Sequence, residues 1–520
     1  MADEEATTEG GQEDLSALLS SASLMLFVGS LGSVSRLLER VVMGRLLNSP
    51  GAFGEVQIAF SIMTVSATIA TLGFKEGIPR FMTRFESASD ARGAWVTGTS
   101  LSVALTVLVT IALFLNVERL AARFFEASTP PELLLVFIAT LPFYVGLEIV
   151  VAGIRGRENT IYRTYSRDLI YNVLRLALII VLLLAGYGVV AAGFSYFVSA
   201  LVAFAVALWL FNRLFPIRGA FETRTREMLV FSFPLVLSSM VSILLAQIDT
   251  LMIANFLPSR EAGIYNAAWP LARAVGVIVS SFGFLFLPLM SRLDAGGQYE
   301  EINRMYKLTS KWVFVVTFPA LLCLVVFADD LLLVFGPAYT SGAAALAILA
   351  LGSFTSAAFG RCQDALSAFG YTRYIFAVNA IAGVLNVVLN AVLITGYGAA
   401  PDLGITGAAL ATASSTVTLN GSALAVLWQK SGVNPFSHWT VRAFVLLPAV
   451  LFPPSLLLAR QVTLSLPALI AFVPIAGIAS VALLALTGSL QAEDEIPVEL
   501  VEENLGVEIP LIRRYIPEKE

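Results

Sequence analysis

Runs of about 20 apolar residues follow one another along nearly the whole chain. Of its 520 residues, 57% are hydrophobic and only 13% are charged, roughly half the charged fraction of soluble domains. Within a bilayer every backbone polar group must be bonded inside the protein, which restricts spanning structures to helices and closed barrels. Because the runs are continuous rather than alternating, they predict helices. The fold class that we expect is an all-α polytopic membrane protein.

Counting the apolar runs predicts about fourteen transmembrane helices. Glycine and proline mark the joints between them, as in Asn48-Ser49-Pro50-Gly51. The expected spans are residues 17–46, 52–84, 93–116, 131–155, 165–186, 190–213, 227–256, 262–290, 308–328, 342–368, 371–396, 404–429, 439–459 and 464–488.

The first part of the chain also repeats itself further on. Gly186-Tyr187-Gly188 recurs as Gly396-Tyr397-Gly398 at an offset of 210. At an offset of 209, five residues align with five others: Gly54, Gln57, Ala59, Phe60 and Pro79 with Gly263, Asn266, Ala268, Trp269 and Pro288. An offset that holds across several loops predicts two pseudo-symmetric six-helix lobes followed by two extra helices, the plan of many secondary transporters. The expected domains are an acidic segment 1–14, lobes 15–214 and 215–430, helices 13 and 14 at 431–490, and a charged tail 491–520.

Basic residues gather at alternate joints and so predict the orientation of the chain in a cell membrane. The richer joints hold Arg80, Arg84, Arg92, Arg155, Arg157, Arg163, Arg167, Arg213, Arg218, Arg224, Arg226, Arg292, Arg304, Lys307 and Lys311. The positive-inside rule then places these joints and both termini in the cytoplasm. Met1 to Asp14 is polar and acidic, so no cleaved signal peptide is expected.

The composition disfavours several classes of function. Cys323 and Cys362 both lie in expected helices and have no metal-ligand spacing. His438 is the single histidine, which rules out a multi-histidine catalytic or metal site. The arginines are spread along loops without a basic groove, so we expect no binding of nucleic acid.

Ionisable groups deep in a bilayer are costly, and three such groups are candidates for function. The first lies on the first span, where Arg36 and Arg40 share a helical face beside Glu39. Glu55 and Gln57 on the second span are expected to face the same space. One reading is an interhelical ion pair, and the other is a cationic cavity for a phosphate or pyrophosphate headgroup, which arginine binds in a bidentate manner.

The second group combines Asp249 on the seventh span with amides on the eleventh. Asn379, Asn386 and Asn390 share one face of that helix. Thr412 on the twelfth span adds a hydroxyl. Carboxylate, amide and hydroxyl oxygens suit a hard cation, so this set is either a candidate Na⁺ or H⁺ coupling site or a polar network that holds helices together.

Two further sets lie on the tenth and eighth spans. Arg361 and Asp364 are three residues apart, and we expect them to pair with each other. Asn266, Trp269 and Arg273 are candidate substrate-binding residues. Trp269 is able to stack on a sugar ring, although a tryptophan in such a helix is more commonly a packing residue.

Fourteen spans with a six-plus-six repeat resemble the multidrug/oligosaccharidyl-lipid/polysaccharide exporter superfamily, in particular its polysaccharide-biosynthesis and lipid-linked oligosaccharide flippase branch. The short motifs that carry the resemblance are Ser35-Arg36, Gly54-Glu55, the segment from Phe286 to Arg292, and Gly396-Tyr397-Gly398. It covers about residues 15 to 490. Arginine far exceeds lysine and both termini are acidic, a composition similar to that of proteins from salt-loving archaea.

The resemblance implies two lobes that work by alternating access. In related lipid II flippases, arginines on the first helix line the cavity, and Arg36 matches such a position. Those flippases also bind sodium through helices 7, 11 and 12, where Asp249, Asn386 and Asn390 fall. The family example has a second carboxylate where this chain has Asn390, a departure that weakens the expectation of cation binding.

The leading hypothesis is a flippase, not an enzyme, that moves an isoprenoid-(pyro)phosphate-linked sugar from the cytoplasmic to the outer leaflet. Such a protein would serve surface polysaccharide synthesis or protein N-glycosylation, with no cofactor and with glycan-assembly proteins as candidate partners. The alternative is a multidrug or organic-cation exporter of the same fold, which Asp249 and Glu55 would suit. A third class, an integral-membrane glycan enzyme, is disfavoured because the joints are short and His438 is the one histidine.

Overall fold

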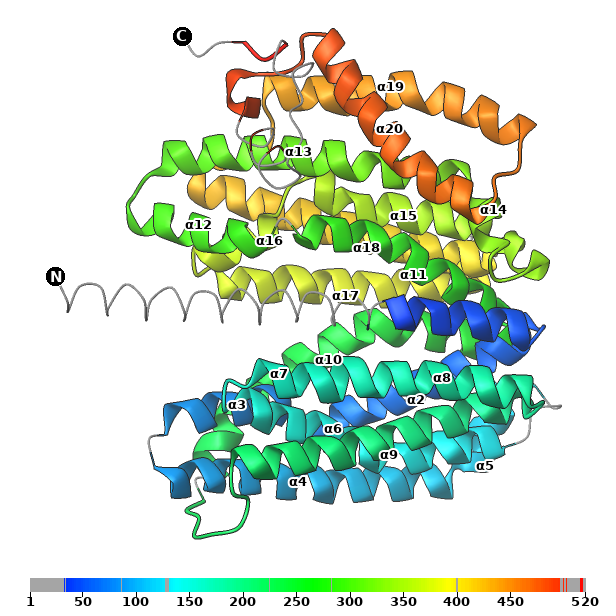
Figure 1. Ribbon diagram of the computed structural model, residues 1–520, viewed down its shortest axis with the longest axis vertical. Helices are drawn as coiled ribbons and strands as arrows, with labels where there is room; N and C mark the ends of the chain where they lie inside the picture. Colours follow the sequence, from blue (N-terminus) through cyan, green and yellow to red (C-terminus); the bar gives the residue numbers. More distant parts are fainter. Residues whose placement is uncertain are drawn as a thin grey trace, which may run out of the picture. The chain divides into compact units, whose positions relative to one another are not determined.

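The computed structural model describes residues 32, 34–85, 87–126, 131–223, 225–281, 283–398, 401–495, 499, 502 and 515–517. All regular elements in these residues are helical, which confirms the predicted all-α polytopic fold (Figure 1). The predicted acidic segment 1–14, the start of the first span and most of the charged tail lie outside the described residues.

The chain divides into two compact units, Met1–Gly263 and Ile264–Glu520. The boundary falls after the seventh expected span, because that helix packs on α2 of the first unit. The helices before the boundary are residues 34–46, α2 Pro50–Thr71, α3 Phe74–Arg84, α4 Ala88–Leu115, α5 Val117–Phe124, α6 Glu132–Arg155, α7 Thr160–Arg163, the π-helical η1 Thr164–Ile170, α8 Tyr171–Leu184, α9 Gly188–Leu214 and α10 Thr225–Phe256.

The boundary lies within α11, and the remaining helices follow it. They are α11 Ser259–Ser281, α12 Gly283–Ala295, α13 Tyr299–Val326, α14 Ala328–Leu332, η2 Pro337–Gly342, α15 Ala343–Ala358, α16 Cys362–Ala368, α17 Thr372–Thr395, α18 Gly404–Ser431, α19 His438–Gln461, α20 Leu466–Leu486 and η3 Ala492–Asp494.

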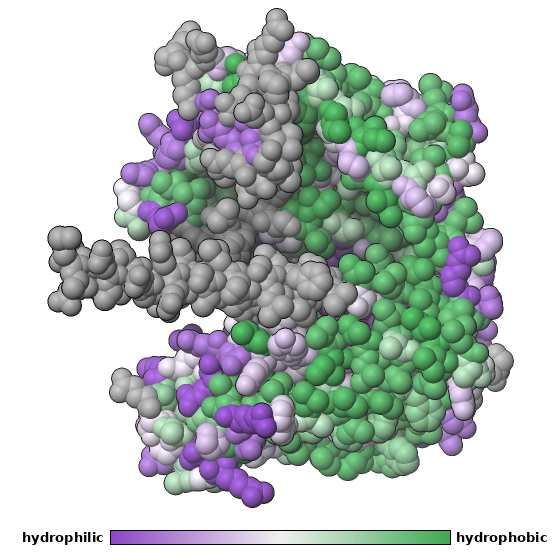
Figure 2. Space-filling model, viewed as in Figure 1, coloured by the Kyte–Doolittle hydropathy of each residue, from purple (hydrophilic) through white to green (hydrophobic). Residues whose placement is uncertain are grey.

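Within the described residues, 11 helices are long and apolar enough to cross a membrane. Each coincides with one of the expected spans. The other three expected spans coincide with the helix at 34–46, with the run from η1 through α8, and with α10. The chain is therefore a multi-pass membrane protein. On the face shown in Figure 2, hydrophobic side chains cover the middle of the helices, and hydrophilic ones gather toward the helix ends.

The sequence repeat reappears as a repeat of helices. Ser259 begins α11 209 residues after Pro50 begins α2. The long helices α4 and α13 are each followed by a short one, α5 and α14. The second span is broken between α2 and α3, where Leu72 and Gly73 adopt φ angles of 46° and 69°.

In the first unit, α9 packs along α6 and α8, and α6 also contacts α2 and α4 (Figure 1). Small residues make this close approach possible: Ala200, Ala203 and Ala207 of α9 are fully buried. A Cβ at Gly153 of α6 would lie 2.8 Å from the ring of Phe211. The first unit is thus a tight bundle around α6 and α9.

In the second unit, α18 packs along α15 and α17, and α13 contacts α15, α19 and α20. The segment after α20 is fixed to α13 by a buried ion pair. Lys311 Nζ lies 2.5 Å from Asp494 Oδ2 and donates to the carbonyl of Ser489 at 3.0 Å. Trp312 Nε1 donates to the other oxygen of Asp494 at 2.7 Å.

Candidate functional site

A cavity of about 330 Å³ opens inside the first unit, and most of its polar lining residues are charged. Its walls come from the helix at 34–46 and from α2, α3, α6, α7, η1 and α8. The lining residues are Arg36, Phe60, Lys75, Tyr144, Glu148, Val151, Arg155, Arg163, Arg167, Asp168, Tyr171, Asn172 and Arg175. We call this the basic cavity.

Glu148 of α6 organises one wall of the basic cavity. It is 5% exposed and pairs with two cations. Arg167 Nε lies 2.6 Å from Oε1, and Lys75 Nζ lies 2.9 Å from Oε2. Arg167 also donates to the hydroxyl of Tyr144 at 3.1 Å. A buried carboxylate with two basic partners is stable in a membrane protein and fixes the direction of both cationic side chains.

A second ion pair lies deeper and joins the first span to α8. Arg175 donates to Glu39 Oε2 from Nε at 2.8 Å and from Nη2 at 2.5 Å. Tyr196 of α9 donates to Glu39 Oε1 at 2.6 Å. Because both oxygens of Glu39 already accept hydrogen bonds, this residue holds helices together. It thereby matches the interhelical ion pair that was one of the two readings of the first group.

A π-helical turn places the basic residues of the fifth span. η1 runs from Thr164 to Ile170 and joins α7 to α8. Such turns widen a helix by one residue and often occur at functional sites. Here the turn presents Arg167 and Asp168 to the cavity, next to Arg163 at the end of α7.

The charges around the cavity leave it basic. Six basic residues and two acidic residues line it. Two further carboxylates, Glu39 and Glu76, pair with Arg175 and Arg155. Six basic groups against four carboxylates leave an excess of two positive charges. Such a cavity attracts an anion, and its arginines offer planar, bidentate donors.

Of the predicted residues Arg36, Arg40, Glu55 and Gln57, the structure places only Arg36 at the wall of the basic cavity. Arg36 lines the basic cavity with an exposed side chain. Arg40, one turn further along the same helix, is half-buried and is not a lining residue. Glu55 accepts a hydrogen bond from the backbone N–H of Glu126 at 3.1 Å, and Gln57 is buried in α2; neither lines the cavity.

The predicted residues of the eighth span belong to the second unit. The guanidinium of Arg273 lies over the ring of Trp269, 4.5 Å from its centre, and Asn266 is buried on the same helix. The predicted pair of Arg361 and Asp364 forms, and Arg361 also donates to the carbonyl of Val279. Trp269 thus has a cationic side chain on one face of its ring.

Three of the four candidate cation ligands meet in the second unit. Asn386 donates to the hydroxyl of Thr412 at 3.1 Å. Asn390 donates to the backbone and side-chain oxygens of Asn386 at 3.0 and 3.1 Å. The hydroxyl of Tyr265 lies 3.5 Å from that of Thr412. The fourth, Asp249, is buried in α10 and belongs to the first unit.

Sequence reasoning missed several residues of the basic cavity. Glu148 and Arg175 stand inside apolar spans, so the cost of burying charge should have identified them. In the sequence, Arg155, Arg163 and Arg167 mark orientation alone, because they lie at a joint between spans. No local signal identifies Tyr144 or Tyr171, because aromatic residues are common throughout such spans.

Comparisons with known proteins place this arrangement in a family. A family model described as polysaccharide biosynthesis protein matches residues 18–294, and one described as MatE matches residues 234–392. A protein of Haloferax volcanii named probable flippase AglR is 23% identical over 384 residues, which cover 72% of this chain and 76% of the relative.

Two solved structures share the fold. The lipid II flippase MurJ, in an inward closed conformation, aligns with a TM-score of 0.70 and 13% identity over 88% of this chain and 97% of its own. A multidrug resistance MATE family transporter in an inward-facing conformation aligns with a TM-score of 0.64 and 16% identity over 79% and 99%. These likenesses confirm the predicted all-α polytopic fold. Since the first family model covers more than half of the 520 residues, this chain belongs to the polysaccharide biosynthesis protein family, in the multidrug/oligosaccharidyl-lipid/polysaccharide exporter superfamily.

Proposed function

We propose that this protein is a flippase that carries an isoprenoid-(pyro)phosphate-linked sugar from the cytoplasmic to the outer leaflet by alternating access. The observation that carries the proposal is the basic cavity, with two more positive charges than negative ones around it. The relative named probable flippase AglR supports the activity. Under this proposal the protein is a transporter rather than an enzyme.

The cavity meets the physical needs of such cargo. A sugar phosphate cannot enter hydrocarbon without losing its hydration, whereas arginine and lysine donors replace that hydration. Phe60, Tyr144 and Tyr171 add flat aromatic surfaces to the same walls, against which a sugar ring can pack. The isoprenoid chain would stay in the bilayer while the headgroup crosses.

Arg36 is the residue proposed to contact the phosphate. Its side chain is exposed at the wall of the basic cavity, where a headgroup can reach it. Glu39 and Arg40, on the same helix as Arg36, stay proposed members of the substrate site. Asn266, Trp269 and Arg273 of the second unit, together with Glu55 and Gln57, stay proposed substrate contacts.

The test is transfer of a fluorescent lipid-linked sugar in proteoliposomes. Arg36→Ala should lower the initial rate at least tenfold, because a charge-assisted contact to the headgroup is worth roughly 1.5–3 kcal/mol. Arg36→Lys should keep part of the rate, since it retains the charge but not the bidentate geometry. Arg460→Ala, at the end of α19 and outside the cavity, serves as the control. Normal transfer by Arg36→Ala would remove this role from Arg36.

The same preparation tests the alternative, an organic-cation exporter. That function needs an acidic cavity, whereas the cavity of the first unit is basic. Efflux of organic cations without transfer of any polyprenyl-linked sugar would favour the exporter. Membership of glycan-assembly complexes is a separate prediction, tested by copurification from native membranes.

A further inference from the structure

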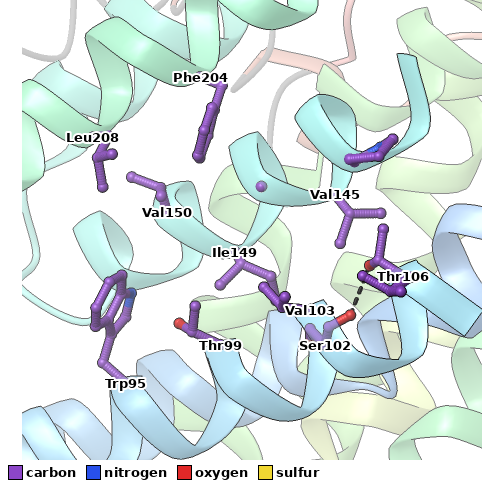
Figure 3. Close-up of a pocket in the computed structure, with 13 residues that line it drawn as sticks. Trp95, Thr99, Ser102, Val103, Thr106, Val145, Ile149, Val150, Phe204 and Leu208 are labelled. Carbon is purple, nitrogen blue, oxygen red and sulfur yellow. Dashed lines mark hydrogen bonds between the residues drawn. The ribbon is translucent and has the colours of Figure 1, made fainter. Parts of the chain in front are cut away.

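A second cavity, of about 300 Å³, lies between α4, α6 and α9 and is almost entirely apolar (Figure 3). Its walls hold Val145, Ile149 and Val150 from α6 and Phe204 and Leu208 from α9. None of the residues that line the basic cavity lines this one. It is therefore a separate site.

One wall of this cavity faces the membrane. Val103 and Val107 of α4 line it and are 54% and 51% exposed. Pro142 of α6 is a third exposed lining residue. Because α4 is a spanning helix whose outer surface is apolar, the medium at this opening is hydrocarbon, and an apolar cavity open to hydrocarbon accepts a hydrocarbon chain.

The cavity has one polar end. Trp95 Nε1 and Thr99 Oγ1 are buried atoms that line it and have no hydrogen-bond partner among the described residues. The two residues are one helical turn apart on α4, and Figure 3 shows them close together. Trp95 is 7% exposed. Two buried donors without acceptors point to a ligand that supplies oxygen atoms there.

The other hydroxyls of the lining are already satisfied. Thr106 donates to the carbonyl of Ser102 at 2.6 Å, and Ser102 donates to the carbonyl of Thr71 at 3.4 Å. Polarity is thus confined to the Trp95 end. From Trp95 to Val107 the helix rises about 18 Å, close to half the thickness of a bilayer core.

We propose that this cavity binds one hydrocarbon chain of a bilayer lipid from the leaflet next to the start of α4. The ester, ether or phosphate oxygens at the head of that chain accept hydrogen bonds from Trp95 and Thr99. The chain then runs along Val103 toward Val107 and fills the apolar part. The site does not depend on the proposed cargo of the basic cavity.

The test uses the fluorescence of Trp95 in proteoliposomes made from phosphatidylcholine brominated in mid-chain. The contribution of Trp95 is the difference between the unmodified protein and Trp95→Phe. Bromine in the bound chain should quench at least half of that contribution. Val103→Phe places a ring at the opening of the cavity and should restore most of the quenched Trp95 fluorescence. Val181→Phe changes a residue of α8 that is 61% exposed and should not restore that fluorescence.

Two results would overturn the proposal. One is that brominated chains do not quench the Trp95 contribution, or that they quench it to the same extent in Val103→Phe as in the unmodified protein. The other is recovery of fluorescence on adding a few per cent of polyprenyl phosphate, which would assign the cavity to a carried lipid. If Val103→Phe does not fold, Leu208→Phe fills the cavity from α9, and native mass spectrometry of retained phospholipid gives the same comparison.

Discussion

At the scale of single residues, two buried carboxylates of the first unit each bind two other side chains. Glu148 forms ion pairs with Lys75 and Arg167. Glu39 forms an ion pair with Arg175 and accepts a hydrogen bond from Tyr196. Each carboxylate lies in an apolar helix and repays its burial through short hydrogen bonds. These pairs fix the charged side chains in the walls of the basic cavity, so that the proposed headgroup would meet donors that are already oriented.

Glu148→Gln should lower stability by about 3–5 kcal/mol, because it leaves two cations of a buried network without their counter-charge. The measurement is the midpoint of thermal unfolding in detergent. Glu76→Gln is the matched control, since Glu76 pairs with Arg155 at the surface with side-chain exposures of 46% and 36%. That change should cost at most about 1 kcal/mol. Equal losses from both variants would show that Glu148 has no special structural role.

At the scale of helices, the first turns of α2 and α11 approach each other closely through two equivalent glycine–carbonyl contacts. A Cβ at Gly54 would lie 1.9 Å from the carbonyl oxygen of Ser259, and a Cβ at Gly263 would lie 1.9 Å from that of Pro50. Gly54 and Gly263 correspond in the repeat, and so do Pro50 and Ser259. The contact is therefore self-complementary, like an interface on a two-fold axis, and only glycine allows it.

Gly54→Ala should lower the unfolding midpoint, because a methyl group at this distance forces the backbones apart at a cost of about 1–3 kcal/mol. Gly276→Ala is the control within α11, where a Cβ would have no atom within 4 Å. That variant should be neutral or gain about 0.5–1 kcal/mol from the helix preference of alanine. A Gly54→Ala protein as stable as Gly276→Ala would contradict the close crossing.

At the scale of the whole molecule, alternating access needs a source of free energy. The cluster of Asn386, Asn390 and Thr412 collects amide and hydroxyl oxygens in the second unit. Such neutral oxygens suit Na⁺ when a carboxylate is added, and Asp249 is the buried carboxylate that the sequence proposes for coupling. Coupling through these residues stays a prediction.

An inward sodium gradient should accelerate transfer of lipid-linked sugar severalfold in proteoliposomes, and Asp249→Asn should abolish the acceleration while leaving the slow basal rate. The physical reason is that the amide keeps the size of the side chain but loses the charge that balances the cation. Asp402→Asn removes an exposed carboxylate outside the candidate set, serves as the control for loss of charge in general, and should keep the acceleration. Acceleration that persists in Asp249→Asn would exclude Asp249 from coupling.

The positions of the helices follow from the sequence alone. A backbone in hydrocarbon must close its hydrogen bonds within each span, so length and hydropathy locate helices such as α4 and α13 without knowledge of any contact. The offset of about 210 likewise revealed the repeat, because duplicated halves keep the same succession of helices. The all-α fold and the superfamily were predictable for these reasons.

The partners of the buried charges were decided by the tertiary structure. Glu39 was expected beside Arg36 and Arg40, its neighbours on one helix, but its short hydrogen bonds are to Arg175, 136 residues away, and to Tyr196. Helical periodicity fixes which residues share a face, whereas packing decides which face meets which helix. Lys75, Glu148 and Arg167 come from three different helices, and they form one wall because α3, α6 and η1 pack together.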